Sequence, residues 1–280
     1  MDSSILALVL ASALMHAGWN LMAKRGHDGL VAMALIKAPN IVLAAAILAY
    51  AGLPAPASWP WLAASTCVNA LYFYFLINAY RVGDLSLAYP VSRGMAPLLV
   101  LFLSLAVAGE VPSAAAAAGV ALICLGIFVL AARRGASREH RATLAWAAGV
   151  GLCIATYTVI DGIGARASGT SVGYVALLNI LTGVIVCGTA AARRGAAFTQ
   201  ALRHDWLNGL IGGAMMLGAY TIVVFALTQA PMAQVAALRE SSVIFAAILG
   251  AIFLREPFGA RRVAASVAVA AGIAILAFGR

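Results

Sequence analysis

Two arginines stand inside long apolar runs of this sequence. Arg93 lies in "LAYPVSRGMAPLLVLFLSLAVAGE" (87–110), and Arg239, followed by Glu240, lies in "VAALRESSVIFAAILGAIFLRE" (235–256). The planar guanidinium group forms two parallel hydrogen bonds to a carboxylate or a phosphate. Either arginine therefore suits the recognition of a small ligand that carries an anionic group.

Both arginines are predicted to lie deep in their apolar segments. Each follows the predicted start of its helix by about nine residues, which is roughly 13 Å at 1.5 Å per residue, near the middle of a ~30 Å hydrocarbon layer. A charge at that depth costs about 2.5–3.5 kcal/mol on insertion scales, so it needs a partner or a function. Pro90 and Pro97 remove helix hydrogen bonds around Arg93, and the freed carbonyls must be satisfied by protein or by water in a cavity.

The alternative interpretation of the arginines is structural. Arg239 would pair with Asp161 or Glu240, or Arg93 with Glu240, and the pair would hold two parts of the bundle together. Two further charged residues lie in apolar runs. Lys37 is either buried or reaches the membrane surface with its long side chain, and Asp161 is either buried or interfacial. We favour anion binding by at least one arginine, and the sequence alone leaves the alternatives open.

Other ionisable residues have simpler interpretations. Glu110 and Glu256 follow predicted helix ends, where we expect helix caps or salt bridges rather than transport carboxylates. His16 and Asp161 are the candidate proton carriers, because a buried imidazole or carboxyl can exchange a proton near neutral pH.

Polar and aromatic residues recur at helical spacing on several apolar segments. A single polar residue on such a segment is more typical of contacts between helices. As a set they indicate the wall of a substrate cavity. The predicted substrate-binding residues are Arg93, Arg239, Glu240, His16, Trp19, Asn20, Tyr72, Tyr157, Asp161 and Asn179.

The elements that position these residues are predicted to be membrane-spanning helices. Of the 280 residues, 64% are hydrophobic and 10% are charged, and the mean hydropathy is +1.00, whereas a soluble domain is about a quarter charged. The net charge of +9 resides mostly in short loops, which argues against nucleic-acid binding. Ten spans are predicted, at about 3–23, 30–50, 59–80, 84–108, 113–133, 142–164, 170–192, 206–228, 231–254 and 258–278.

The chain also repeats itself. At an offset of 146 residues, Arg93 falls on Arg239, Tyr74 on Tyr220, Glu110 on Glu256 and Gly126 on Gly272. Five spans separate the copies, and an odd number inverts the second copy in the membrane. The sequence therefore predicts an all-α membrane protein with ten transmembrane helices as two inverted five-helix repeats, 1–134 and 142–280, in one integral membrane domain.

The chain resembles the drug/metabolite transporter superfamily, in its ten-span EamA-type branch. The resemblance rests on "AGEVPSAAAAAGVALICLGIFVL" (108–130), its partner "LREPFGARRVAASVAVAAGIAIL" (254–276) and "HAGWNLMAK" (16–24). It implies a ten-helix transporter with a central cavity, usually an exporter of small metabolites, and it does not imply a particular substrate.

Motifs of enzymes, of nucleotide binding and of metal binding are missing from the sequence. We therefore expect no enzymatic activity and no cofactor or metal, with proton coupling or facilitation in place of ATP. The first predicted span carries Asn20 and no acidic residue, which argues against a lipophilic-cation exporter. The favoured function is secondary export of a small anionic or zwitterionic metabolite, such as an amino acid, a carboxylate or a phosphonate.

A flippase for a lipid-linked anionic head group is the alternative function. Its basic rim would come from the cluster Arg133, Arg134, Arg138 and Arg141, which more often sets membrane topology. In either case the expected partners are a small-molecule substrate and the lipid bilayer, without nucleic acid. The protein is expected to be a monomer or homodimer in the bacterial inner membrane.

The distribution of positive charge predicts an orientation. Thirteen Lys and Arg residues fall in loops after odd-numbered spans, two fall on the side of the termini, and three lie in the membrane. Positive loops stay cytoplasmic, so the charge rule puts both termini outside the cytoplasm. The family resemblance implies the opposite orientation, and we favour the charge rule.

Overall fold

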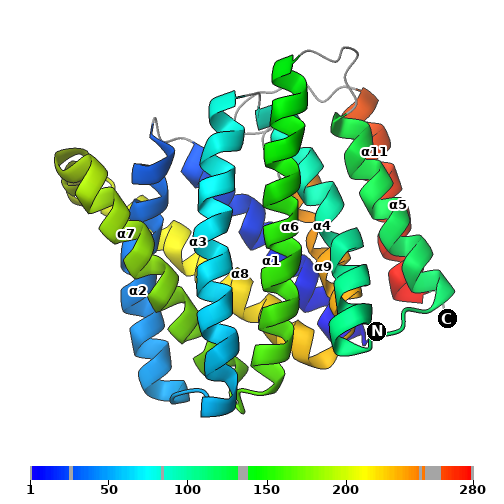
Figure 1. The fold of residues 1–280 in the computed structure, drawn as a ribbon, viewed down its shortest axis with the longest axis horizontal. Coiled ribbons are helices and arrows are strands. Elements are labelled where there is room, and N and C mark those ends of the chain that lie inside the picture. The colour runs from blue at the N-terminus through cyan, green and yellow to red at the C-terminus, as the bar shows by residue number, and fades with distance from the viewer. Residues whose placement is uncertain are drawn as a thin grey trace.

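The protein is a bundle of helices (Figure 1). The structure, a computed structural model, describes residues 2–24, 28–82, 85–131, 138–245, 248–249 and 260–278. Regular structure in these residues is helical, which confirms the all-α class for this part of the chain. The helices are α1 (Ser3–Lys24), α2 (Gly29–Ala51), the 3₁₀ turn η1 (Pro56–Ser58), α3 (Trp59–Val82), α4 (Leu85–Ala108), α5 (Ala114–Ala131), α6 (Arg138–Arg166), α7 (Ser171–His204), α8 (Trp206–Gln229), α9 (Met232–Arg239) and α11 (Ala260–Phe278).

Six of the described helices contain a segment long and apolar enough to cross a membrane. The segments are Ser3–Ala23, Gly29–Ala51, Val91–Ala108, Ala142–Arg166, Ser171–His204 and Trp206–Gln229, and Ala114–Val129 and Val263–Phe278 are shorter apolar helices. Large apolar side chains such as Val42 and Phe102 are exposed on the outside of the bundle, as expected where lipid replaces water. The count of ten spans stays a prediction.

Helices far apart in sequence form the main contacts. α2 packs along α7 and α5 packs along α11, at opposite edges of the bundle (Figure 1). Between these edges α6 packs on both α3 and α4, and α1 packs on α8. α9 contacts α4 and α1, so it lies within the bundle rather than at its edge.

The contact between α5 and α11 depends on glycine. A Cβ atom at Gly126 would lie 2.8 Å from the Cβ of Ala268, and one at Gly272 would lie 2.8 Å from the carbonyl oxygen of Gly119. Backbones that approach this closely are typical of helix pairs in membranes, where small residues replace the hydrophobic effect as the basis of packing. Gly126 and Gly272, which the offset of 146 residues relates, thus lie in the same helix contact.

The predicted connection at 193–205 is wrong. α7 continues to His204 and changes direction at Gly195, whose φ of 12° and ψ of −87° are not helical. Phe198 beyond the bend is buried and belongs to an apolar cluster with Ala34 of α2. The two arginines before Gly195 look like a loop in sequence, but this apolar contact continues the helix.

The predicted span at 231–254 contains a break in its helix. α9 ends at Arg239 after 8 residues. Glu240 and Ser241 form a turn in which the amides of both residues bond carbonyls three residues earlier, and helical residues resume at Ser242. The turn therefore interrupts the helix beside two charged side chains. Residues 250–259, which include Glu256, and residues 132–137, which include the end of the first predicted repeat, lie outside the described residues.

The orientation prediction can be tested at the chain termini. α1 begins and α11 ends at the same end of the bundle (Figure 1), so one reporter at the C-terminus reports on both. We expect a C-terminal alkaline phosphatase fusion to be active and a C-terminal green fluorescent protein fusion to be dark, because the positive loops lie at the other end. A fluorescent and phosphatase-negative pair would show that the charge rule fails here.

Candidate functional site

Arg93 and Glu240 form a buried ion pair. The Nε atom of Arg93 on α4 lies 2.8 Å from the Oε2 atom of Glu240, and the two side chains are 5% and 2% exposed. Arg93 also donates from Nη2 to the hydroxyl of Ser242 at 3.0 Å. The break after α9 makes this geometry possible, because it turns Glu240 and Ser242 toward α4. One of the predicted structural pairs is therefore present.

Arg239, the last residue of α9, has a different environment. Its side chain is buried, at 6% exposure. Its Nη2 atom donates to the hydroxyl of Tyr157 on α6 at 3.3 Å. Among the described residues, no carboxylate oxygen lies within 4.0 Å of this guanidinium. The guanidinium of Arg93 thus interacts with Glu240 and Ser242, whereas the guanidinium of Arg239 has N–H donors that remain available for a ligand.

Tyr157 and His16, which interact with the arginines, each pack against a further aromatic ring. The rings of Tyr157 and Tyr72 meet edge to face with centroids 6.2 Å apart. His16 on α1 lies within electrostatic range of both Arg93 and Arg239, and Trp19 meets its ring edge to face at 4.9 Å. We use the name arginine cluster for Arg93, Arg239, Glu240, Tyr157 and His16.

Asp161 on α6 is fully buried, at 0% exposure. Its carboxylate accepts a hydrogen bond from the hydroxyl of Tyr174 at 2.9 Å and another from Tyr220. The Ser65 hydroxyl is a third donor, and Arg239 acts on the carboxylate through space. The structure therefore excludes a solvent-exposed Asp161 and connects this residue to the arginine cluster.

Two of the predicted site residues have contacts other than the two arginines. Asn20 donates from its amide nitrogen to the His16 carbonyl of its own helix at 2.7 Å. Asn179 on α7 accepts a hydrogen bond from the Nζ atom of Lys37 at 3.0 Å, and Thr182 accepts a second at 3.1 Å. Lys37 is 7% exposed and turns into the α2–α7 contact, so its side chain does not reach the membrane surface.

Some residues of the site were not predicted from the sequence. Ser242, Ser65 and Tyr174 look like ordinary helix residues in an apolar chain. Tyr220 was noticed only as the repeat partner of Tyr74. Tyr74 itself is exposed, whereas Tyr220 bonds Asp161, so the repeat conserves the residue type at this position but not its contacts.

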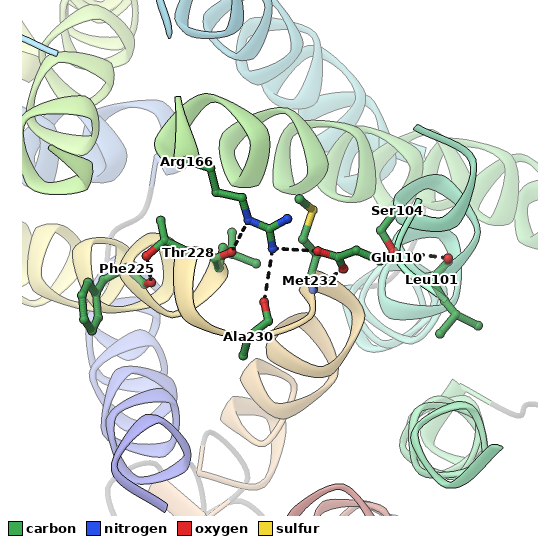
Figure 2. A network of polar contacts seen from close by, with 9 residues as sticks. Leu101, Ser104, Glu110, Arg166, Phe225, Thr228, Ala230 and Met232 are labelled. Carbon is green, nitrogen blue, oxygen red and sulfur yellow. Dashed lines mark hydrogen bonds and ion pairs between the residues drawn. The ribbon is translucent and has the colours of Figure 1, made fainter. Parts of the chain in front are cut away.

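A second polar network lies at the end of the bundle where α8 ends and α9 begins (Figure 2). Glu110 follows Gly109, whose φ of 68° ends α4. The Glu110 carboxylate accepts from Arg166 Nη2 at 2.6 Å and from the amide of Met232 at 2.7 Å. This confirms the prediction that Glu110 forms a cap or a salt bridge, although the helix capped is α9.

Arg166 completes the network from the other side. Its Nε atom donates to the carbonyl of Leu227 at 3.0 Å, and Nη2 reaches the carbonyl of Ala230 at 3.4 Å. The Glu110 carboxylate therefore lies at the N-terminus of α9, and the Arg166 guanidinium lies at the C-terminus of α8. Both positions are favourable, because the unpaired N–H groups of a helix start attract a negative charge and the unpaired carbonyls of a helix end attract a positive one. Because Glu110 belongs to the first predicted repeat, the network links the two repeats.

Two pockets lie on either side of this network. One, of about 260 Å³, is lined by Glu110, Ser104 and Gln234 among others, and one of about 390 Å³ is lined by Arg166, Ser171 and Thr228 among others. Neither is lined by a residue of the arginine cluster. The predicted central cavity thus stays a prediction, and the arginine cluster is covered in this arrangement.

We expect Glu110→Gln to let water and small reagents enter the bundle more readily at the end where α8 meets α9. The substitution removes the charge that holds Arg166 and weakens the cap on α9. The measurement is the rate at which a membrane-impermeant maleimide labels Gln234→Cys, in a background without the four native cysteines. Arg194→Gln is the matched control, since it breaks the 2.6 Å pair with Asp28 at the start of α2. Equal labelling rates with and without Glu110→Gln would contradict the expectation.

The described helices form a multi-pass membrane protein with charged residues buried inside the bundle. Residues 141–278 match the model of the EamA-like transporter family. A transporter-family domain is therefore present over the second half of the chain, which agrees with the resemblance noted from the sequence.

A solved crystal structure, described only as that of a protein, has a TM-score of 0.78 to this chain, with 18% identity over 98% of this chain and 96% of the other. At that identity the similarity shows the fold alone. No curated protein matches the chain. No group of three or more potential metal ligands occurs in the part of the chain that the structure describes.

Proposed function

We propose that this protein is a secondary transporter that exports a small anionic or zwitterionic metabolite, such as an amino acid, a carboxylate or a phosphonate, across the bacterial inner membrane. The EamA-like domain supports the general class. The substrate class follows from the chemistry of the arginine cluster.

The observation that carries the proposal is the difference between the two arginines. Arg93 is neutralised by Glu240 at 2.8 Å, which leaves it the role of fixing the break after α9. Arg239 is buried with a single 3.3 Å hydrogen bond to Tyr157. A buried guanidinium with unused donors is costly unless an anionic group completes it. A carboxylate, phosphonate or phosphate would use the planar fork of Arg239.

The surroundings of Arg239 also suit a cationic end of the substrate. Tyr157 bonds the guanidinium and its ring packs against that of Tyr72, and the face of an aromatic ring attracts an ammonium group. Asp161, held by Tyr174 and Tyr220, supplies a negative charge on the same helix as Tyr157. A zwitterion such as an amino acid would satisfy both ends.

The pattern of helix contacts supports a transporter built from two inverted repeats. In such a fold a two-fold axis exchanges the first five helices with the last five. The axis would relate the α1–α8 contact to the α3–α6 contact, and it would map the α2–α7 and α5–α11 contacts onto themselves. Substrates of such transporters bind between the repeats, where Arg93 and Glu240 meet here.

The test is binding followed by transport. The purified protein is screened by thermal shift against the twenty amino acids, dicarboxylates, inorganic phosphate and simple phosphonates, and radiolabelled hits are then followed in proteoliposomes. We expect at least one compound with an anionic group to stabilise the protein and to cross the membrane. Stabilisation by lipophilic cations alone would contradict the proposal, and movement of a fluorescent anionic lipid without movement of any soluble compound would favour the flippase.

A further inference from the structure

Lys37 lies in a polar site of its own, apart from the arginine cluster. Its Nζ atom donates to the Asn179 side-chain oxygen at 3.0 Å and to the Thr182 hydroxyl oxygen at 3.1 Å. All three side chains are buried in the contact between α2 and α7. Within the described residues, no carboxylate pairs with this amine.

The two acceptors are oriented by bonds to their own helix. The amide nitrogen of Asn179 donates to the Val175 carbonyl at 3.0 Å, which leaves the amide oxygen for Lys37. The hydroxyl hydrogen of Thr182 is directed to the Leu178 carbonyl at 2.9 Å, so the hydroxyl oxygen accepts. The site therefore offers two fixed acceptors to one nitrogen.

Two acceptors match the hydrogen-bonding capacity of a neutral amine. A neutral lysine has two N–H bonds, and both have partners here. An ammonium group adds a third N–H and a positive charge, for which the described residues supply neither a third acceptor nor a counter-ion. A charged, incompletely bonded group in a membrane interior is costly, so the closed site favours the amine over the ammonium.

Neighbouring groups among the described residues do not provide a carboxylate for an ammonium at Lys37. Cys187 on α7 is the titratable group that acts on Lys37 through space, and its thiol bonds the Ala34 carbonyl. α8 presents glycines to α2, and its Tyr220 is bonded to Asp161. On α1, His16 belongs to the arginine cluster.

The charged pair nearest along α2 is outside the membrane segment. Arg194 lies beside Asp28 at 2.6 Å and, through this hydrogen bond, lowers the pKa of that carboxyl. Asp28 precedes Lys37 by nine residues, or about 13 Å along a helix, so it does not neutralise an ammonium at Lys37.

The helix beside Lys37 is weakened. Pro39 lies within α2, and because proline has no N–H, the carbonyl of Leu35 has no intrahelical donor. Gly209 of α8 packs so closely that a Cβ there would lie 2.5 Å from this carbonyl oxygen. A bend of α2 at this point would open the α2–α7 contact next to Lys37.

We propose that Lys37 is a proton carrier of this transporter, an assignment that rests on the proposed function. When α2 and α7 separate and water enters, the lone pair on Nζ takes a proton from hydronium and forms a third N–H bond. When the helices close, that bond breaks and the proton returns to water, with no change in redox state. Lys37 thereby couples transport to the proton gradient without contacting the substrate.

The chain allows a direct measurement, because Lys24 and Lys37 are its only lysines. Protein labelled with nitrogen-15 lysine is placed in lipid nanodiscs, and Lys24→Arg assigns the remaining signal. The pH is then raised in steps. We expect the Nζ signal of Lys37 to change from that of an ammonium to that of an amine at a lower pH than the signal of Lys24, because Lys37 has two acceptors and is buried. If Lys37 keeps an ammonium signal up to the pH at which Lys24 loses its proton, the proposal is overturned.

A transport assay distinguishes a role of Lys37 in carrying protons from a role in binding the substrate. Proteoliposomes receive a radiolabelled amino-acid mixture or radiolabelled phosphate, with and without a pH gradient. Lys37→Gln and Lys37→Met are expected to retain exchange at equal pH on both sides, which needs no proton release, and to lose accumulation driven by the gradient. Thermal stability is measured to confirm folding.

The other outcomes are also decisive. If both variants accumulate substrate like the wild type, or if both lose exchange while folded, Lys37 is not a proton carrier. If the wild-type protein exchanges neither probe, the proposed function fails for these substrates, and the nitrogen-15 signal alone supports or overturns the state assigned to Lys37.

Discussion

Replacing Arg239 with alanine is expected to abolish substrate binding and transport while the protein still folds. Arg239 is buried and makes one weak hydrogen bond, to Tyr157, so the chain itself loses little when the guanidinium is removed. The bound anion loses a bidentate, charge-assisted partner. Such a loss costs about 2–5 kcal/mol, or ~30-fold and more in affinity.

Two further variants separate charge from geometry at this position. Arg239→Lys is expected to retain weak binding, since it keeps the charge and loses the fork. Tyr157→Phe removes the group that orients Arg239, at a cost of about 1 kcal/mol. Arg203→Ala is the matched control, because Arg203 is exposed in the last turn of α7. Affinity is measured by titration calorimetry with the compound found in the screen. Wild-type affinity in a folded Arg239→Ala protein would refute the assignment.

Replacing Glu240 with glutamine is expected to give the largest loss of stability. Arg93 would keep its buried charge and lose the carboxylate at 2.8 Å. Removing one partner of a buried pair costs about 3–5 kcal/mol, because the other charge is left uncompensated. The measurement is the apparent melting temperature in detergent. Asp28→Asn is the control, since it breaks the exposed Asp28–Arg194 pair, which is worth about 0–1 kcal/mol.

A double variant tests the cause of the loss. Arg93→Met combined with Glu240→Met removes both charges and fills a similar volume, so it should recover most of the stability that Glu240→Gln loses. If Glu240→Gln melts at the wild-type temperature, the pair does not contribute in the way proposed. If the double variant is as unstable as Glu240→Gln, the side chains act through packing and not through charge.

The helical class, the membrane environment and most helix positions follow from the sequence. Runs of about 20 apolar residues leave few alternatives to membrane helices, because each backbone group must be bonded within its own segment. The same physics explains two features that the sequence pattern did not predict. Beyond Gly195, an apolar contact by Phe198 continues α7, and after Arg239 a polar turn interrupts the helix. Both depend on contacts with other helices, which a local pattern does not contain.

The candidate site, too, was predicted from the sequence only in part. The sequence by itself determined that Arg93, Arg239, Glu240 and Asp161 need partners, because a charge in an apolar run is costly wherever the chain folds. Only the tertiary structure decided which partners they have. It pairs Arg93 with Glu240, holds Asp161 with Tyr174 and Tyr220, and places Lys37 between Asn179 and Thr182. These contacts join residues of different helices. The spacing of polar residues along one helix shows which of them share a face, but it does not show which helix packs against that face. The choice between a paired arginine and an available one is therefore made by helix packing.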